Sequence, residues 1–281
     1  MSTNAIASFQ RPTNNSPARH TRVSSNLAVV IMAAGKGTRM KSPDMAKVMF
    51  PVGGVPMIHH VVERAFECAP QTVVVIIGHN RESVRGYLDG AFNGRVTFAE
   101  QIEQLGTGHA IMQALPSLEG FDGDVVVLSG DVPLLRRQTL EELHRVHQST
   151  NAVATVLTVS ADDPTGYGRV VRLADESVDR IVEHKDATDA ERTIDEINSG
   201  IYMFGAKALV DALAHLTNDN VQGEYYLTDV FGWLRSRGER IAAFRSPDFG
   251  EIQGINTVEQ LADVNVEFAR RAATTVADEP Q

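Results

Sequence analysis

The stretch that decides the fold is Leu27-Ala-Val-Val-Ile-Met-Ala-Ala-Gly-Lys-Gly-Thr-Arg-Met40. Its first six residues are apolar and rich in β-branched side chains, which is typical of a parallel strand buried on both faces. A glycine-rich loop follows directly, and the helical spacing of apolar residues begins near Pro56. The pattern therefore predicts a strand, a loop and a helix, the repeating unit of an α/β protein.

The same alternation of strand and helix continues along the chain. It predicts strands at 72–77, 96–99 and 124–129, with helices at 82–88 and 107–115 between them. The later elements that we expect are a helix at 140–148, a strand at 152–159, short strands up to 204, helices at 207–215 and 226–237, a strand at 240–244 and an amphipathic helix at 257–271. These elements indicate an α/β fold with a mainly parallel sheet, helices on both faces and ligands at the carboxyl ends of the strands.

Composition excludes several classes of protein. The 281 residues are 43% hydrophobic and 22% charged, as in an ordinary globular protein, and the net charge of −10 argues against a nucleic-acid partner. Cys68 is the single cysteine, so the chain has no internal disulfide and no CxxC metal site. No stretch approaches the roughly 18 apolar residues of a membrane span, and residues 1–26 lack the apolar segment of a signal peptide. We therefore expect a cytoplasmic protein with no membrane partner.

Three segments are expected along the chain. Residues 1–26 are rich in Ser, Thr, Asn, Arg and Pro and have little apolar periodicity, which predicts a disordered tail. Residues 27–271 carry the alternating pattern of the folded domain, and residues 272–281 form a polar C-terminal tail. No repeat of fixed period is present, and in particular no hexapeptide pattern of a β-helix.

The glycine loop matches neither common phosphate-binding signature. A P-loop needs a glycine where Val30 stands, and Thr38 comes one position too late for its hydroxyl residue. A dinucleotide fingerprint needs a third glycine where Met40 stands. What remains is a loop in which Gly35 and Gly37, without side chains, let backbone amides approach a phosphate closely.

Basic residues gather in and after this loop. Lys36, Arg39, Lys41 and Lys47 place four cations within twelve residues against one acid, Asp44. A solvated surface loop can carry such a run of charge. The position after the first strand, in a chain of net negative charge, favours an anion-binding loop instead.

A carboxylate follows the strand at 124–129, in Ser129-Gly-Asp-Val-Pro-Leu134. At the carboxyl end of a strand, Asp131 is placed to hold a hard cation such as Mg²⁺, which shares its oxygen ligands with substrate phosphates. An aspartate close before Pro133 also serves as a turn or helix-capping residue. The motif by itself leaves both roles open.

Together these residues resemble the signature of sugar-nucleotide pyrophosphorylases. The likeness is closer to the uridylyltransferase domain of bacterial bifunctional N-acetylglucosamine-1-phosphate uridylyltransferase/glucosamine-1-phosphate acetyltransferases, and it extends over about residues 27–271. Besides Ile31–Met40 with Lys47, the segments that carry it are Glu103-Gln-Leu-Gly-Thr-Gly-His-Ala110, Asp163-Pro-Thr-Gly-Tyr-Gly-Arg169, Glu183-His-Lys-Asp-Ala-Thr-Asp189 and Gln222-Gly-Glu-Tyr-Tyr-Leu-Thr-Asp229.

The resemblance implies a Rossmann-like nucleotidyltransferase fold of the GT-A type, with three layers and a mostly parallel mixed sheet. It also implies that Arg39 and Lys47 are catalytic residues that contact the triphosphate, and that Asp131 and Asn256 hold Mg²⁺. The nucleotide-binding residues that it implies are Met32, Ala33, Ala34, Gly35, Gln101, Gly106, Thr107, Ser129 and Gly130. The sugar-binding residues that it implies are Gly168, Glu183 and Asn198.

The implied reaction transfers a uridylyl group from UTP to N-acetylglucosamine 1-phosphate and gives pyrophosphate and UDP-N-acetylglucosamine, a cell-wall precursor. The attacking phosphate oxygen is already ionised, so no catalytic His or Cys is expected, and an in-line displacement needs mainly positioning and charge neutralisation. Two alternatives stay open: a pyrophosphorylase for another sugar or nucleotide, and a non-catalytic nucleotide-sugar sensor. The amide of Gln101 can flip and does not exclude cytosine.

Two departures from the family pattern stand out. Ala46 replaces a proline before the catalytic lysine, so we expect a looser loop and a less well placed Lys47. The chain also stops after its final helix, where the bifunctional enzymes continue into a β-helix that carries the acetyltransferase. This favours either a single-activity homologue or an excised domain.

Overall fold

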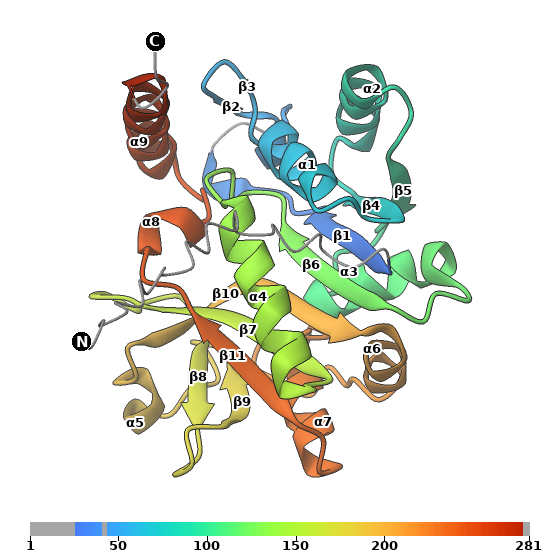
Figure 1. Cartoon of the computed structure of the whole chain (residues 1–281), viewed down its shortest axis with the longest axis vertical. Coiled ribbons are helices and arrows are strands. Elements are labelled where there is room, and N and C mark those ends of the chain that lie inside the picture. The colour runs from blue at the N-terminus through green and yellow to red at the C-terminus, as the bar shows by residue number, and fades with distance from the viewer. Residues whose placement is uncertain (1–25, 41–43, 278–281) are drawn as a thin grey trace, which may run out of the picture.

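The structure is a computed structural model that describes residues 26–40 and 44–277. Its centre is a mixed sheet with the strand order β11-β7-β10-β6-β1-β4-β5, to which the β8–β9 hairpin is attached through β10 (Figure 1). Within the described residues the strands of this sheet are β1 (Leu27–Ala33), β4 (Thr72–Ile77), β5 (Thr97–Glu100), β6 (Asp124–Ser129), β7 (Ala154–Ser160), β8 (Arg169–Arg172), β9 (Val178–Val182), β10 (Glu196–Gly205) and β11 (Ile241–Arg245).

The sheet is mostly parallel. Strand β1 pairs in parallel with β4 and β6, β4 pairs in parallel with β5, and β11 pairs in parallel with β7. Strand β10 runs antiparallel to both of its neighbours, β6 and β7. The predicted α/β fold with a mostly parallel mixed sheet is therefore confirmed.

Helices cover both faces of the sheet and make a three-layer structure (Figure 1). The helices are α1 (Met57–Glu67), α2 (Arg81–Phe92), α3 (Thr107–Ala114), α4 (Arg137–Thr150), α5 (Asp189–Arg192), α6 (Ala206–Leu213), α7 (Asp229–Ser236), α8 (Phe249–Ile252) and α9 (Val258–Ala277). Alternate residues of β1 enter two separate cores: Val29 and Ile31 pack with α1, α2, α4 and α9, and Ala28 and Val30 pack with α3, α6 and α7. Burial on both sides explains why the strand is apolar at every position.

The carboxyl ends of β1, β4, β5 and β6 lie at one edge of the sheet, because these strands are parallel. Met32 of β1 lies beside Ser129 of β6, and the backbone N–H of Gly130 donates to the carbonyl of Met32 over 2.9 Å. The glycine loop after β1 and the Gly130–Asp131 turn after β6 are thus neighbours, as the sequence predicted.

Several short elements have no counterpart in the sequence prediction. They are the β2–β3 hairpin (Pro51–Val52 and Val55–Pro56), α5, α8, and the 3₁₀ turns η1 (Thr38–Met40), η2 (Lys47–Met49) and η3 (Leu115–Leu118). Each is too short to show a periodic pattern.

The ends of the chain differ from expectation in one respect. Helix α9 continues to Ala277, beyond the predicted end at Arg271, so the first six residues of the predicted polar tail are helical. The predicted disordered tail falls at residues 1–25, outside the described residues, except for Asn26. No helix in the described ranges is long and apolar enough to span a membrane.

Candidate active site

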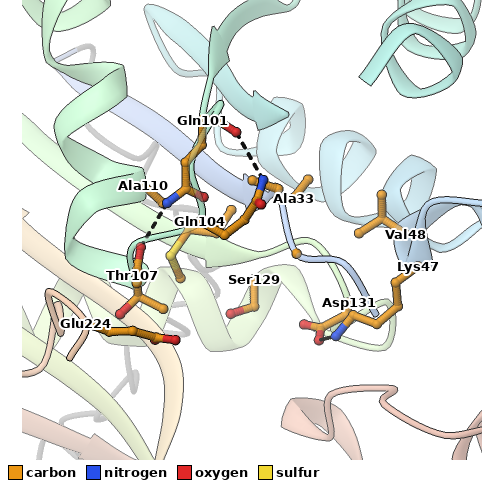
Figure 2. Close-up of a pocket in the computed structure, with 14 residues that line it drawn as sticks. Ala33, Lys47, Val48, Gln101, Gln104, Thr107, Ala110, Ser129, Asp131 and Glu224 are labelled. Carbon is orange, nitrogen blue, oxygen red and sulfur yellow. Dashed lines mark hydrogen bonds and ion pairs between the residues drawn. The ribbon is translucent and has the colours of Figure 1, made fainter. Parts of the chain in front are cut away.

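A cavity of about 280 Å³ opens at the carboxyl edge of the parallel strands (Figure 2). Among the predicted site residues, its lining includes Met32, Ala33, Ala34, Gly35, Lys47, Gln101, Gly106, Thr107, Ser129 and Asp131. Figure 2 shows Gln101 and Thr107 at one end, Lys47 and Asp131 at the other, and Ser129 between them. The cavity therefore has the Lys47–Asp131 pair at one end and mostly uncharged groups at the other, where the acid Glu224 lies beside Thr107.

The lining also contains residues that the sequence did not single out. They are Val48, Gln104, Ala110 and Glu224. Glu224 comes from the Gln222–Asp229 segment that carried part of the family resemblance, which was the signal available for it. The predicted residue Gly130 lies beneath the lining, where a Cβ would be 2.9 Å from Ile58 Cδ1 and 3.0 Å from the Met32 carbonyl oxygen.

Lys47 and Asp131 form the charged end of the cavity, and Lys47 also contacts Asn256, which lies outside the lining. The Lys47 ammonium forms an ion pair with Asp131 Oδ2 and donates a second hydrogen bond to Asn256 Oδ1 over 3.0 Å. The side chains of Lys47 and Asp131 are only 14% and 19% exposed, so bulk water screens this pair weakly. The two predicted metal ligands and one predicted catalytic cation thus form a single cluster.

Local structure holds the backbones of Asp131 and Asn256, the two predicted metal ligands, in place. The backbone N–H of Ile255 donates to the Asp131 carbonyl over 3.0 Å, which ties the two segments together. Gln260 Oε1 accepts from the backbone N–H of Asn256 over 2.7 Å and from that of Thr257 over 3.1 Å. Thr257 Oγ1 accepts in turn from the backbone N–H of Gln260. This reciprocal capping at the start of α9 fixes the backbone of Asn256.

The glycine loop guides Lys47 toward this cluster. Gly37 has φ +58°, and a Cβ there would lie 2.5 Å from Lys47 Cβ, so only glycine lets the lysine stem pass. Ala46, which replaces the usual proline, has φ −61° and is 1% exposed. Proline would impose the same φ. The backbone of Ala46 thus keeps the φ that proline would impose, and the expected looser loop stays a prediction.

Arg39 is placed differently from Lys47. It lies exposed on η1, outside the cavity lining, and has no ion-pair partner among the described residues. Burial is the main cause that raises the pKa of Tyr167, and the charge of Asp131 raises it further. The charge of Arg39 acts in the opposite direction and lowers this pKa. Lys41, the other predicted cation of this loop, lies outside the described residues.

Gln101 lies at the end of the cavity opposite the Lys47–Asp131 pair and is 3% exposed. Its amide nitrogen donates to the Gly106 carbonyl over 3.0 Å and lies 3.1 Å from His109 Nδ1. A carbonyl oxygen can only accept, so the bond to Gly106 fixes the orientation of the amide. The amide oxygen of Gln101 is consequently the end that remains as an acceptor.

The Gly106 loop packs against the Gln222–Asp229 segment. The N–H of Tyr225 donates to the Leu105 carbonyl over 2.8 Å, and that of Leu227 donates to Thr107 Oγ1 over 3.0 Å. Gly106 has φ +106°, and a Cβ there would lie 2.5 Å from the Tyr225 carbonyl oxygen. The family resemblance implied a nucleotide-binding role for Gly106. The structure shows that the Tyr225 backbone already requires a glycine here.

The three predicted sugar-binding residues form a second cluster. A Cβ on Gly168 would lie 3.5 Å from both Asn198 Cβ and Glu183 Oε2. Asn198 Nδ2 donates to the Tyr202 hydroxyl over 2.7 Å, and Asn198 Oδ1 accepts from the Gly200 N–H over 3.1 Å. Burial raises the pKa of Glu183.

The sugar cluster connects to the cavity through Ser129. The Ser129 hydroxyl donates to the Gly200 carbonyl over 3.2 Å, and Gly200 follows Asn198 in β10. Thr228 donates to Glu183 Oε1 over 3.0 Å and comes from the segment that also contributes Glu224 to the cavity. The sugar cluster thus adjoins the cavity without being part of its lining.

Asp131 and Asn256 suit a magnesium ion better than a soft metal. Both present oxygen atoms, and the positively charged Lys47 ammonium already lies between those atoms. The described residues contain no group of three or more His, Cys, Asp and Glu side chains that could hold a metal. Mg²⁺ needs only one or two protein ligands where phosphates and water complete its shell.

Comparison with known proteins places this site in a family. The Nucleotidyl transferase family profile matches residues 28–262. The chain belongs to the nucleotidyl transferase family. It is 50% identical over 238 residues to the bifunctional protein GlmU of Geotalea uraniireducens, covering 85% of this chain and 51% of that protein. It is 48% identical over 250 residues to the GlmU of Corynebacterium efficiens, covering 88% and 51%.

The relatives confirm the family resemblance and set its extent. The chain spans about half the length of the GlmU proteins that it matches. Among solved structures, a UDP-glucose pyrophosphorylase complexed with UDP-glucose superposes with a TM-score of 0.69 at 19% identity, covering 87% of this chain and 98% of that one. At that identity the match supports the fold alone.

Proposed function

We propose that this nucleotidyltransferase transfers a uridylyl group from UTP to N-acetylglucosamine 1-phosphate and releases pyrophosphate. The observation that carries the proposal is the contact of Lys47 with Asp131 and Asn256 at one end of a cavity whose other end holds Gln101. A nucleoside triphosphate would place its phosphate chain at the Lys47 end of the cavity and its uncharged base beside Gln101.

The orientation of Gln101 supports uracil as the base. With its nitrogen bound to the Gly106 carbonyl, the side chain offers an oxygen acceptor. Uracil carries a hydrogen-bond donor at N3, whereas cytosine carries an acceptor at the same position. A buried acceptor facing another acceptor is costly, so this arrangement favours UTP over CTP.

The charged end suits the chemistry of phosphoryl transfer. An oxygen of the sugar 1-phosphate attacks the α-phosphorus, a new P–O bond forms, and the bond to the bridging oxygen of the leaving pyrophosphate breaks. Lys47 lies where it can neutralise the phosphate chain, and Arg39 is exposed on the same loop. Mg²⁺ held by Asp131 and Asn256 would withdraw charge from the phosphates. No general base is required, because the nucleophile is already ionised.

The sugar cluster supplies complementary groups. Asn198 uses one amide hydrogen for Tyr202 and keeps the other, while Glu183 provides carboxylate oxygen atoms. Together with the backbone of Gly168, these groups suit the hydroxyls and acetamido group of an N-acetylhexosamine. The family profile and the GlmU relatives at 48–50% identity support the coarser class, a sugar 1-phosphate nucleotidyltransferase.

A pyrophosphate-release assay over a small panel tests the proposal. The panel combines UTP, dTTP, CTP and ATP with the 1-phosphates of N-acetylglucosamine, N-acetylgalactosamine and glucose. The highest kcat/KM is expected for UTP with N-acetylglucosamine 1-phosphate, and removal of Mg²⁺ should abolish turnover.

The panel also separates the competing functions. A preference for a purine triphosphate would exclude uridylyl transfer. A preference for another sugar 1-phosphate would exclude N-acetylglucosamine as the substrate. Binding of UTP without pyrophosphate release from any pair would identify a non-catalytic sensor.

A further inference from the structure

Lys47 lies in the position that a metal ion would take. Its ammonium contacts Asp131 Oδ2 and Asn256 Oδ1, the two oxygen atoms best placed to hold a cation. An ammonium group and a divalent cation repel each other and cannot share this pair of ligands. Metal binding at Asp131 and Asn256 therefore requires Lys47 to leave.

The backbones of Asp131 and Asn256 are held by contacts that do not involve Lys47. Asn256 is fixed by Gln260, and the backbone of Asp131 is tied to Ile255. Gly254 closes the cluster, since a Cβ there would lie 3.5 Å from Asp131 Oδ2 and 3.6 Å from Asn256 Nδ2. Removing the ammonium should leave the two side chains close together on held backbones, with their oxygen atoms released for a cation.

The Lys47 ammonium can take a second position, along the glycine loop. Its stem passes along Gly37, whose absent side chain leaves room for the lysine Cβ, Cγ and Cδ atoms. The adjoining backbone at Gly35 lines the same cavity as Lys47 and Asp131. Rotation about the flexible lysine stem can carry the ammonium from Asp131 to a triphosphate bound along this loop.

We propose that Lys47 is an internal counter-ion that keeps the metal ligands closed until a triphosphate draws its ammonium away. Metal and nucleotide binding are then coupled, because the nucleotide releases the metal ligands and the metal releases the lysine. By linkage, each ligand strengthens the binding of the other to the same degree. This inference rests on the proposed function for the identity of the metal ligands.

Titration with Mn²⁺ in the absence of nucleotide, followed by electron paramagnetic resonance, tests the coupling. Lys47→Met keeps a stem of similar length without the charge and should bind Mn²⁺ at least about tenfold more tightly than the wild type, within the usual range of such coupling. Lys47→Gln should behave in the same way. Lys47→Arg keeps the charge and should bind Mn²⁺ as weakly as the wild type.

Lys36→Met is the matched control, because Lys36 is exposed on the same loop and does not line the cavity. Its Mn²⁺ affinity should equal that of the wild type. Melting temperatures establish that each variant is folded.

Two results would overturn the proposal. They differ in whether the metal site of the proposed function is refuted as well. If both neutral variants bind Mn²⁺ no more tightly than the wild type, but Asp131→Asn abolishes binding in each, the metal site stands and the coupling is refuted. If Mn²⁺ binding in the neutral variants is unaffected by Asp131→Asn, the metal assignment in the proposed function fails as well.

Discussion

The side-chain amide of Gln101 is fixed by its hydrogen bond to the carbonyl oxygen of Gly106, 3.0 Å away. The same carbonyl accepts from the backbone N–H of Ala110 in the first turn of α3, so Gly106 cannot turn away without disturbing the helix. The acceptor that Gln101 offers to a base is therefore set by the backbone of a neighbouring loop.

Truncating Gln101 should weaken the discrimination between bases. Gln101→Ala is expected to lower kcat/KM for UTP. The corresponding loss of transition-state stabilisation is roughly 1–3 kcal/mol, the cost of losing a buried hydrogen bond to substrate. The value of kcat/KM for CTP should fall less. Gln113→Ala removes an amide from the other side of His109 and serves as the control. Equal losses for UTP and CTP in Gln101→Ala would show that this side chain does not read the base.

Lys47 and Arg39 should act on turnover more than on sugar-phosphate binding. Lys47→Ala and Arg39→Ala are each expected to lower kcat by about a hundredfold, because both charges stabilise the departing pyrophosphate. Lys207→Ala, which removes an exposed cation of α6 that does not line the cavity, should retain most activity. Steady-state kinetics with varied sugar 1-phosphate separate the two constants. A variant whose only defect is a raised KM for the sugar 1-phosphate would contradict the role assigned to that residue.

Ala46→Pro should stabilise the protein without loss of activity. Ala46 already has φ −61°, and its N–H donates to no other described residue, so proline would mainly restrict the unfolded chain. The expected gain is about 0.4–1 kcal/mol in the free energy of unfolding, measured by urea denaturation. Ala69→Pro makes an informative contrast, because Ala69 has φ +51° and should lose stability. A destabilised Ala46→Pro variant would show that the loop needs the alanine.

Glu196 should make stability depend on pH below the neutral range. It is 2% exposed and bonded to Arg172, Arg245 and Thr158, and these partners outweigh its burial and lower its pKa from 4.5 to about 2. A lowered folded-state pKa stabilises the fold above the unfolded value and loses that effect as pH falls toward 2. This group should contribute a loss of about 2 kcal/mol between pH 7 and pH 3.

The measurement for Glu196 is the free energy of unfolding at pH 7 and pH 3. The difference between the two should be smaller in Glu196→Gln than in the wild type by that amount. Glu82→Gln, whose side chain is 81% exposed, should leave the difference unchanged. If the free energy of unfolding depends on pH in the same way in Glu196→Gln and the wild type, Glu196 does not contribute to that dependence.

The regular elements could be predicted because the pattern of apolar residues in the sequence indicates which of their faces are buried. Strands β4 and β6 have the predicted bounds, since both are apolar on both faces. Helix α8 gave no such signal. It is held by Glu251, a fully buried carboxylate that accepts from the backbone N–H of Arg136 and from Thr139 at the start of α4. From the sequence alone, a glutamate such as Glu251 is expected on the surface, so its burial could not be predicted.

The site was predictable as a set of residues but not as a geometry. Lys47 is 84 positions from Asp131 and 209 from Asn256, and no pattern in the chain indicates that its ammonium lies between them. The resemblance to a family suggested which residues matter. Lys47 and Asn256 are brought together by the room that Gly37 leaves for the lysine stem and by the capping of α9. Both are tertiary features.

The most direct test of the account is pyrophosphate release by Asp131→Asn with UTP, N-acetylglucosamine 1-phosphate and saturating Mg²⁺. We expect kcat to fall by about two to three orders of magnitude, because the metal loses its charged protein ligand and Lys47 loses its ion-pair partner. Asp44→Asn, an exposed acid near the same loop, should remain close to the wild type. Turnover near the wild-type rate in a folded Asp131→Asn protein would contradict the assignment of this cluster as the catalytic centre.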